Sequence, residues 1–216
     1  MTPGDLAPTL WLMLALGAYH GINPGMGWLF AVALGMQARD GRAVAASLVP
    51  IALGHLLAVG AIVIAVGLLG RALPPDAVRY SVATLLIAFG MYRLVRHRHP
   101  RWVRMQVGFR DLTIWSFLMA SAHGAGLMVA PLLLPGSALQ AADPTGGHHH
   151  VSAVAGPWGA VLATGVHTVG YLAVTGVVAW VVYSRLGLAL LRTAWLNLDV
   201  VWAVALLVTG VVALLV

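Results

Sequence analysis

The stretch from Ala43 to Gly70 reads AVAASLVPIALGHLLAVGAIVIAVGLLG and contains no charged residue. A helix needs about 20 mainly apolar residues to cross the hydrocarbon core of a bilayer, and this stretch exceeds that length. Residues 6–38, 112–142 and 144–184 are three further windows without charge. The sequence therefore predicts an all-α integral membrane protein.

Composition supports the same fold class and excludes several functions. Charged residues make up 8% of the chain, whereas a soluble domain usually has about 25%. The twelve basic residues are all Arg and lie between the apolar stretches, so the net charge does not indicate a nucleic-acid partner. The chain has no cysteine, which excludes thiol chemistry, and no P-loop motif for ATP.

Six membrane spans are predicted within one transmembrane domain, residues 1–216, at residues 8–36, 43–69, 77–95, 112–135, 156–183 and 194–215. Ten of the twelve Arg residues fall in three loops on one side of this arrangement. The positive-inside rule places those loops in the cytoplasm and both termini outside. The expected location is a bacterial inner membrane.

The two halves of the chain carry similar motifs. Ala18-Tyr19-His20-Gly21 in the first predicted span corresponds to Ser121-Ala122-His123-Gly124 in the fourth. His55 lies in the second span and His167 in the fifth. Because three spans per half is an odd number, the halves are expected to form inverted repeats, about 8–95 and 112–216, joined by an Arg-rich cytoplasmic loop at 96–111.

His20, His55, His123 and His167 all fall near the middle of their spans. Polar side chains at this depth are costly and are candidates for function. Imidazole is a common ligand of divalent transition metals. The four histidines therefore form the predicted metal site. The alternative is that each one only bonds to a neighbouring helix.

The first span is expected to break after His20. Pro24 has no N–H, and its ring clashes with the carbonyl of the residue four positions earlier. We expect the helix to open there and to free backbone oxygens beside His20. Asn23 can cap the second part of the helix, and Asn23 and Met26 are candidate additional ligands.

Gly17-Ala18-Tyr19-His20-Gly21-Ile22-Asn23-Pro24-Gly25-Met26 resembles the first-helix signature of the nickel/cobalt efflux (NicO-type) transporters, His-Gly-Leu-x-Pro-Gly-His. His55 is similar to the histidine of that family's second helix. The resemblance implies metal-site roles for His20 and His55, and a place in the LysE-like group of six-span exporters. Met26 stands where the family has its second motif histidine, so the identity of the metal stays open.

Other polar residues are predicted to have supporting roles. Three adjacent histidines lie on a Gly-rich outer loop and are candidates for collecting metal: His148, His149 and His150. Four residues lie close in sequence to the central histidines and are expected to orient them: Ser121, Thr164, Thr168 and Tyr171. The chain could also form a homo-oligomer.

The leading hypothesis is a secondary transporter, not an enzyme, that exports a divalent transition-metal cation and whose halves rock about the histidine site. One alternative is a membrane metalloenzyme or redox protein with histidine-ligated haem or non-haem metal. Another is a LysE-like exporter of an amino acid or small organic solute. Metal analysis and an absorbance spectrum would separate the three.

Overall fold

The computed structural model describes residues 7–95, 108–133, 157–186 and 198–215, and all regular structure in these ranges is helical. Short turns of 3₁₀ helix, η1 (Pro24–Met26), and of π helix, η2 (Val182–Leu186), accompany the α-helices. Eight α-helices lie in the described ranges, namely α1 (Ala7–Ile22), α2 (Trp28–Ala38), α3 (Gly41–Ala72), α4 (Pro75–Val95), α5 (Phe109–Ala122), α6 (Ala125–Leu133), α8 (Pro157–Val181) and α9 (Leu198–Leu215). No strand occurs there, which confirms the all-α prediction for these residues.

Two helices in the described part of the chain are long and apolar enough to cross a membrane, Gly41–Ala72 and Trp158–Arg185. The first has 32 residues and is therefore about 48 Å long at 1.5 Å per residue. That length exceeds a hydrocarbon core of about 30 Å. The chain thus contains elements of the size that a membrane protein requires.

The predicted break in the first span lies between α1 and α2. Asn23 begins the η1 turn, and its side-chain oxygen accepts a hydrogen bond from the N–H of Gly25 at 2.9 Å. Pro24 takes the first position of the turn, where a missing N–H costs nothing. Gly27 has a φ of 127°, which favours glycine, and α2 starts at the next residue.

The fourth predicted span is also broken, although we expected it to be continuous from 112 to 135. The helix stops after α5, and α6 starts at Ala125. Gly124 has a φ of 70°, and a left-handed residue cannot continue a right-handed helix. The other spans agree with α3, α4, α8 and α9; residues 134–135, 156 and 194–197 lie outside the described ranges.

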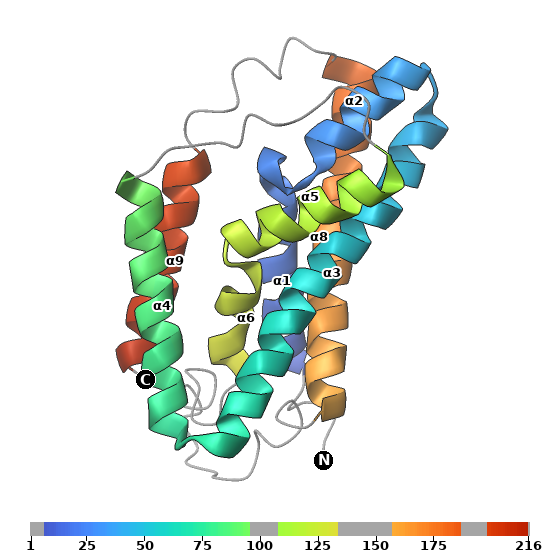
Figure 1. Ribbon diagram of the computed structural model, residues 1–216. Helices are drawn as coiled ribbons and strands as arrows, with labels where there is room; N and C mark the ends of the chain where they lie inside the picture. The colour runs from blue at the N-terminus through green and yellow to red at the C-terminus, as the bar shows by residue number, and fades with distance from the viewer. Residues whose placement is uncertain (1–6, 96–107, 134–156, 187–197, 216) are drawn as a thin grey trace.

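The helices run alternately between the two ends of the molecule (Figure 1). In this view α1 and α2 run upward, α3 runs downward and α4 runs upward again. The second half starts in the opposite sense: α5 and α6 descend, α8 ascends and α9 descends. The start of α1 and the end of α9 consequently lie at the same end of the molecule.

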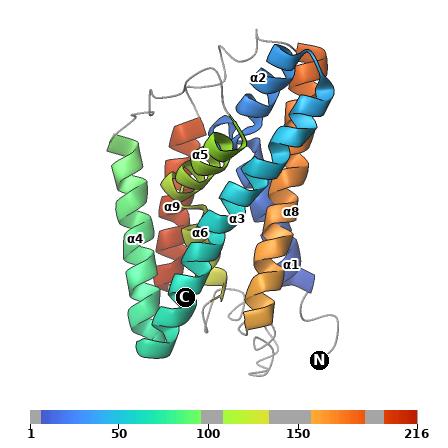
Figure 2. The same ribbon diagram turned by 45° about the vertical axis from the view of Figure 1, so that its right-hand side comes forward.

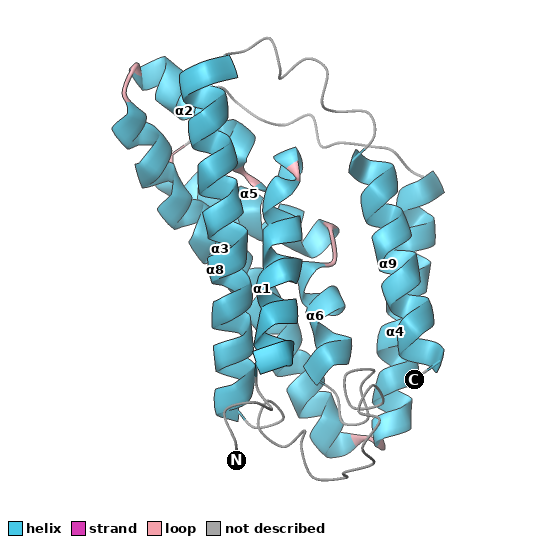
Figure 3. Ribbon diagram, turned by 180° about the vertical axis from the view of Figure 1, so that it is seen from behind, coloured by secondary structure: helices cyan, strands magenta, loops and turns pink. Residues whose placement is uncertain are grey.

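Most of the packing joins one half of the chain to the other. The three most extensive helix pairs are α1 with α8, α3 with α5, and α4 with α9. Seen from behind, α1 lies beside α8, whereas α4 and α9 form a pair that stands apart from them (Figure 3). The turned view also separates the α4–α9 pair from α8 (Figure 2). The two halves are therefore interleaved.

The buried apolar residues form two clusters, one within the larger group of helices and one where α4 and α9 meet that group. The larger cluster joins α1, α2, α3, α5, α6 and α8 through residues such as Met13, Val32 and Ile51. The smaller one joins α4 and α9 to α6 and to the end of α3, with Leu86 and Leu206 at its centre. We call the helices of the larger cluster the central bundle, and we call α4 and α9 the α4–α9 pair.

Glycines bring α1 and α8 into backbone contact. A Cβ on Gly17 would lie 1.9 Å from the carbonyl oxygen of His167, and one on Gly170 would lie 2.3 Å from that of Leu14. A Cβ on Gly21 would lie 2.5 Å from the carbonyl oxygen of Tyr171. Larger residues cannot occupy these positions without separating the helices, so the glycines fix the distance between α1 and α8.

Candidate functional site

The four predicted histidines are among the most buried side chains of the described residues. His20, His55 and His167 are 0% exposed and His123 is 1% exposed. They come from α1, α3, the α5–α6 break and α8, which meet near the middle of the molecule (Figure 1). Burying four imidazoles is costly unless their polar atoms are bonded.

Three of these imidazole rings contact one another. The ring centroids of His20 and His167 are 5.0 Å apart, those of His55 and His167 are 5.4 Å apart, and those of His20 and His55 are 5.9 Å apart. The rings come from α1, α3 and α8, so both halves of the chain contribute. We call His20, His55 and His167 the histidine cluster.

His123 lies against the η1 turn. Its Cε1 atom is 3.5 Å from the point that a Cβ on Gly25 would occupy, and the Cε atom of Met119 is 3.2 Å from the same point. The residue is close enough to His20 for their charges to interact. His123 therefore borders the histidine cluster on the side of the broken helix.

The two histidines at the helix breaks are held in the same way. The Nδ1–H of His20 donates to the carbonyl of Leu16 at 2.8 Å, and that of His123 donates to the carbonyl of Met119 at 2.8 Å. A carbonyl can only accept, so this bond places the proton on Nδ1. Each Nε2 is then the ring nitrogen with a lone pair, which is a common second-shell arrangement of metal-binding histidines.

His55 and His167 are held less firmly by hydrogen bonds. Within the described residues, both ring nitrogens of His55 are buried and make no hydrogen bond. Neither nitrogen of His167 makes one of normal geometry, although the backbone of Met13 lies close enough to act on it electrostatically. Buried polar atoms are usually bonded, so these nitrogens indicate capacity for a ligand.

Tyr171 connects the histidine cluster to the helix break. Its ring stacks on His55 with centroids 3.9 Å apart and planes inclined by 17°. Its hydroxyl donates a short hydrogen bond to the carbonyl of Met26, in the η1 turn. The predicted supporting role of Tyr171 therefore corresponds to a direct contact with one of the histidines.

The prediction that the break frees backbone oxygens toward the site is wrong. The carbonyl of His20 accepts from the N–H of Asn23 at 3.3 Å. The carbonyl of Ile22 accepts from the indole N–H of Trp28 at 3.0 Å. The carbonyl of Gly21 faces the Thr175 hydroxyl at 3.5 Å. Side chains and a tight turn use the oxygens that the missing helical bonds would leave open.

The other predicted supporting residues have mixed outcomes. Ser121 is exposed, so its side chain does not orient a buried imidazole. Thr164 and Thr168 are buried, but the Thr168 hydroxyl donates to the Thr164 carbonyl within the same helix at 2.8 Å. Met26 is buried at 1% exposure and Asn23 at 3%. His148, His149 and His150 lie outside the described residues.

Sequence reasoning missed two hydroxyl groups that tie the helices of the site together. Ser116 on α5 donates to the carbonyl of Ile51 on α3 at 2.6 Å, and Thr175 on α8 faces α1 as described above. Ser116 precedes His123 by seven residues and Thr175 follows His167 by eight. Both spacings place the hydroxyl on the same helix face as the histidine, and this periodicity could have identified them.

The spacing of the histidine cluster is close to that of a metal site, but its nitrogens do not converge. Imidazole nitrogens bind Zn²⁺ at about 2.0–2.1 Å, so the ring centroids of tetrahedral ligands stand about 5 Å apart. The described residues contain no group of three or more His, Asp or Glu side chains placed to hold a metal ion. The planes of His55 and His167 are inclined by only 15°, so these two rings stack by their faces. Binding a shared cation requires the rings to turn.

Comparisons of this chain with protein-family models, with curated proteins and with solved structures found no match.

Proposed function

We propose that this protein is an integral membrane transporter that exports a divalent transition-metal cation through the histidine cluster. The observation that carries the proposal is the contact of three fully buried imidazoles from three helices, at ring-centroid distances of 5.0–5.9 Å. The resemblance of the segment Gly17–Met26 to the NicO-type signature points to the same class of substrate.

The outer surface supports the membrane location. Large apolar side chains are exposed along the helices, including Val49, Ile64 and Val169, each at 60% or more. A soluble monomer rarely exposes apolar patches of this extent. Lipid is the solvent in which an apolar surface around buried polar residues is stable.

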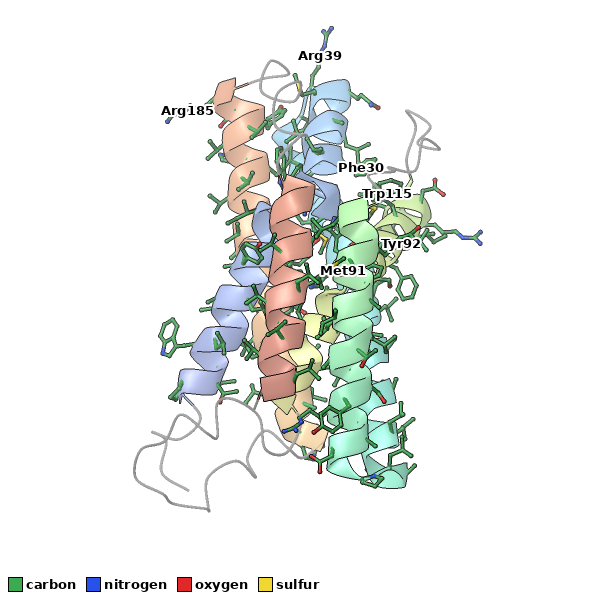
Figure 4. The ribbon with its side chains drawn as sticks, turned by 90° about the vertical axis from the view of Figure 1, so that its left-hand side faces the viewer. Phe30, Arg39, Met91, Tyr92, Trp115 and Arg185 are labelled. Carbon is green, nitrogen blue, oxygen red and sulfur yellow. The ribbon has the colours of Figure 1, made fainter. Side chains whose placement is uncertain are left out.

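Aromatic residues near the helix ends fit the two membrane interfaces. Trp11, Trp158 and Tyr80 lie near the starts of α1, α8 and α4 and are exposed at 68%, 84% and 49%. Tyr92 lies near the opposite end of α4 from Tyr80 (Figure 4), and Phe109 is the first residue of α5; both are exposed. Tyr and Trp gather at both interfaces of membrane proteins.

The charges fit the proposed orientation. Arg39 and Arg185 lie at one end of the molecule (Figure 4), and Arg42 is in the first turn of α3 at that end. Arg71 lies in the last turn of α3 and Arg79 near the start of α4, at the opposite end of the molecule from the start of α3. The first end would face the cytoplasm under the positive-inside rule.

The arrangement of helices supports the proposal of inverted repeats. Each half has a first helix broken at or just after a His-Gly pair, and each half contributes a second histidine from its next long helix. Each major helix pair joins a helix of one half to a helix of the other: α1 with α8, α5 with α3, and α4 with α9. A two-fold relation between oppositely directed halves accounts for this pattern.

The interleaving changes the proposed transport mechanism. Two halves that share every major helix pair cannot rock against each other as rigid bodies. We therefore place the movement at the boundary between the central bundle and the α4–α9 pair, where the smaller apolar cluster joins α4 and α9 to α6 and to the end of α3. Leu206 of α9 contacts the bundle at Gly124, next to His123, so such a movement would reach the site.

Within the site, the four histidines would have two different roles in binding the cation. His20 and His123 would present a fixed Nε2, because their Nδ1–H groups are bonded to backbone. His55 and His167, whose nitrogens make no normal hydrogen bond, would turn to bind the cation and turn back to release it. Metal binding needs neutral imidazoles, so protons would compete with the cation for these nitrogens.

The test is metal analysis of the purified protein beside His20→Ala, His55→Ala, His123→Ala and His167→Ala. After incubation with Co²⁺, Ni²⁺ or Zn²⁺, we expect about one ion per wild-type chain and at least about tenfold weaker binding in each variant. Replacing His148, His149 and His150 by alanine is the matched control, and central binding should remain. Flux into proteoliposomes should follow binding.

Three outcomes would contradict the proposal. Wild-type protein that binds no divalent metal and moves none in proteoliposomes removes it. A Soret band in the absorbance spectrum would point to a histidine-ligated haem protein instead. Retention of a small organic solute, lost in the histidine variants while metal is absent, would favour a solute exporter.

A further inference from the structure

Asn23 has a buried side-chain amide whose oxygen and nitrogen ends lie in different environments. The side chain is 3% exposed, and its Oδ1 atom accepts from the N–H of Gly25 at 2.9 Å. This bond fixes which end of the amide is oxygen and which is nitrogen. Within the described residues, Nδ2 is buried and makes no hydrogen bond.

Asn23 lies near two of the site histidines. The backbone N–H of Asn23 donates to the carbonyl of His20 at 3.3 Å. Its Oδ1 atom and the Cε1 atom of His123 lie 3.3 and 3.5 Å from the same point, the Cβ position of a substituted Gly25. Asn23 therefore belongs to the surroundings of any species held by these histidines.

The chemistry of Nδ2 differs from that of the imidazole nitrogens. An amide nitrogen carries two hydrogen-bond donors and no lone pair for a metal. Buried donors that stay unbonded are costly, and a bare cation would repel their partial positive charge. A group with an oxygen lone pair would satisfy them.

We propose that Asn23 recognises an oxygen ligand that the cation carries into the histidine site. The substrate is then a divalent cation that keeps at least one bound oxygen, from water or from a small carboxylate. Soft monovalent cations such as Ag⁺ prefer sulfur and nitrogen ligands and do not bring such an oxygen. This inference rests on the proposed transport function and makes Asn23 a residue that determines substrate specificity.

The sequence interpretation of Asn23 as a metal ligand changes accordingly. Its oxygen already bonds the Gly25 N–H, and the group left for the substrate is the donor end of the amide. Asn23 would act on the cation through the bound oxygen rather than by direct coordination.

The test compares binding of Co²⁺ and Ag⁺ to the full-length protein and to Asn23→Ser. Serine keeps an oxygen that can cap the η1 turn but does not reach the position of Nδ2. We expect about tenfold weaker Co²⁺ binding and unchanged Ag⁺ binding, so the ratio of the two affinities shifts about tenfold toward Ag⁺. Asp40→Ser, which exchanges the exposed cap of α3, is the control and should leave both affinities unchanged.

Two arms of the experiment separate the sources of the oxygen. If the oxygen is from water, Co²⁺ alone in a non-coordinating buffer shows the full effect of Asn23→Ser. If it is from a carboxylate, the difference between wild type and variant appears when citrate is added with Co²⁺. Either result supports recognition of a metal-bound oxygen.

Other results overturn this inference, and they show whether the proposed transport function fails with it. Equal weakening for Co²⁺ and Ag⁺ means that Asn23 only shapes the turn, and no change for either ion, with citrate as well as without it, means that Asn23 does not contact the substrate; in both cases the transport proposal stands. Asn23→Ala removes the cap as well and shows the size of that structural effect. A wild-type protein that binds neither ion overturns the proposed function together with this inference.

Discussion

At the scale of single residues, small differences in side-chain size decide whether the histidine cluster can form. Gly17 is three residues before His20, and its Cα faces the carbonyl of His167. The absence of one methyl group allows α1 and α8 to approach until the two imidazoles meet. Glycine here is a packing residue of the site.

Gly17→Ala should therefore damage both stability and binding. Its Cβ would lie 1.9 Å from the oxygen of His167, so the helices must separate, at a cost of about 3 kcal/mol. Thermal unfolding in detergent and Co²⁺ affinity should both fall. Gly165→Ala on α8, where nothing lies within 4 Å, is the matched control. Equal behaviour of the two variants would show that the contact is unimportant.

The candidate histidines could be singled out from the sequence because each lies within a long apolar stretch, where a polar residue is conspicuous. The contact of His20, His55 and His167 follows from spacing and repeat position. Their orientation does not, because ring planes depend on neighbours such as Tyr171, which stacks on His55. A sequence pattern defines which residues share a face, whereas rotamers depend on packing across helices.

At the scale of elements, the break between α1 and α2 is held by side chains from outside it. The indole of Trp28 bonds the carbonyl of Ile22, and Tyr171 bonds that of Met26. Pro24 could be read as a helix breaker, but these donors could not be assigned in advance, because one of them is far along the chain. The expectation of open carbonyls failed for this reason.

Trp28→Phe should weaken the break. The buried indole, 4% exposed, would be lost, and the unbonded carbonyl of Ile22 would cost about 1–3 kcal/mol. Hydrogen exchange in the peptide around η1 should accelerate, and the denaturation midpoint should drop. Trp158→Phe is the control because that indole is 84% exposed. An unchanged exchange rate in Trp28→Phe would show that the hydrogen bond from Trp28 to Ile22 does not stabilise the break.

The second break illustrates a different limit of sequence reasoning. His123-Gly124 resembles His20-Gly21, yet the fourth span has no proline at the break and was expected to continue. The left-handed Gly124 allows Leu206 of α9 to approach, with its Cδ2 atom 2.9 Å from a built Cβ. A partner helix near the end of the chain thus accompanies a break that no local signal announces.

At the scale of the whole molecule, the fold consists of a central bundle and the α4–α9 pair. The all-α fold could be predicted from the charge-free apolar windows. Which helices pair could not be predicted, because the exposed and the buried surfaces of the helices are both apolar. Glycines at the contacts between α4 and α9, Gly90 and Gly210, show how close packing selects partners instead.

Cross-linking should distinguish movement within the pair from movement between the pair and the bundle. The chain has no cysteine, so introduced pairs are the only thiols. A short bifunctional thiol reagent joining Leu86→Cys to Gly210→Cys, whose Cβ positions are 3.1 Å apart, should leave Co²⁺ flux unchanged. Joining Leu206→Cys to Gly124→Cys should stop flux until a reductant cleaves the link.

Uncross-linked double variants report any damage from the substitutions themselves. If flux continues with α9 tied to Gly124, the moving boundary lies elsewhere. If tying α4 to α9 also stops it, the two helices do not travel together.

The interleaved packing also determines when the protein can fold during synthesis. α1 finds its main partner only in α8, which begins at Pro157. Until α8 has been synthesised, the backbone surface of α1 at Gly17 has nothing to cover it, and His167, which contacts both His20 and His55, is not yet present. Non-local contacts form slowly, so we expect the histidine cluster to assemble only after α8 has been made.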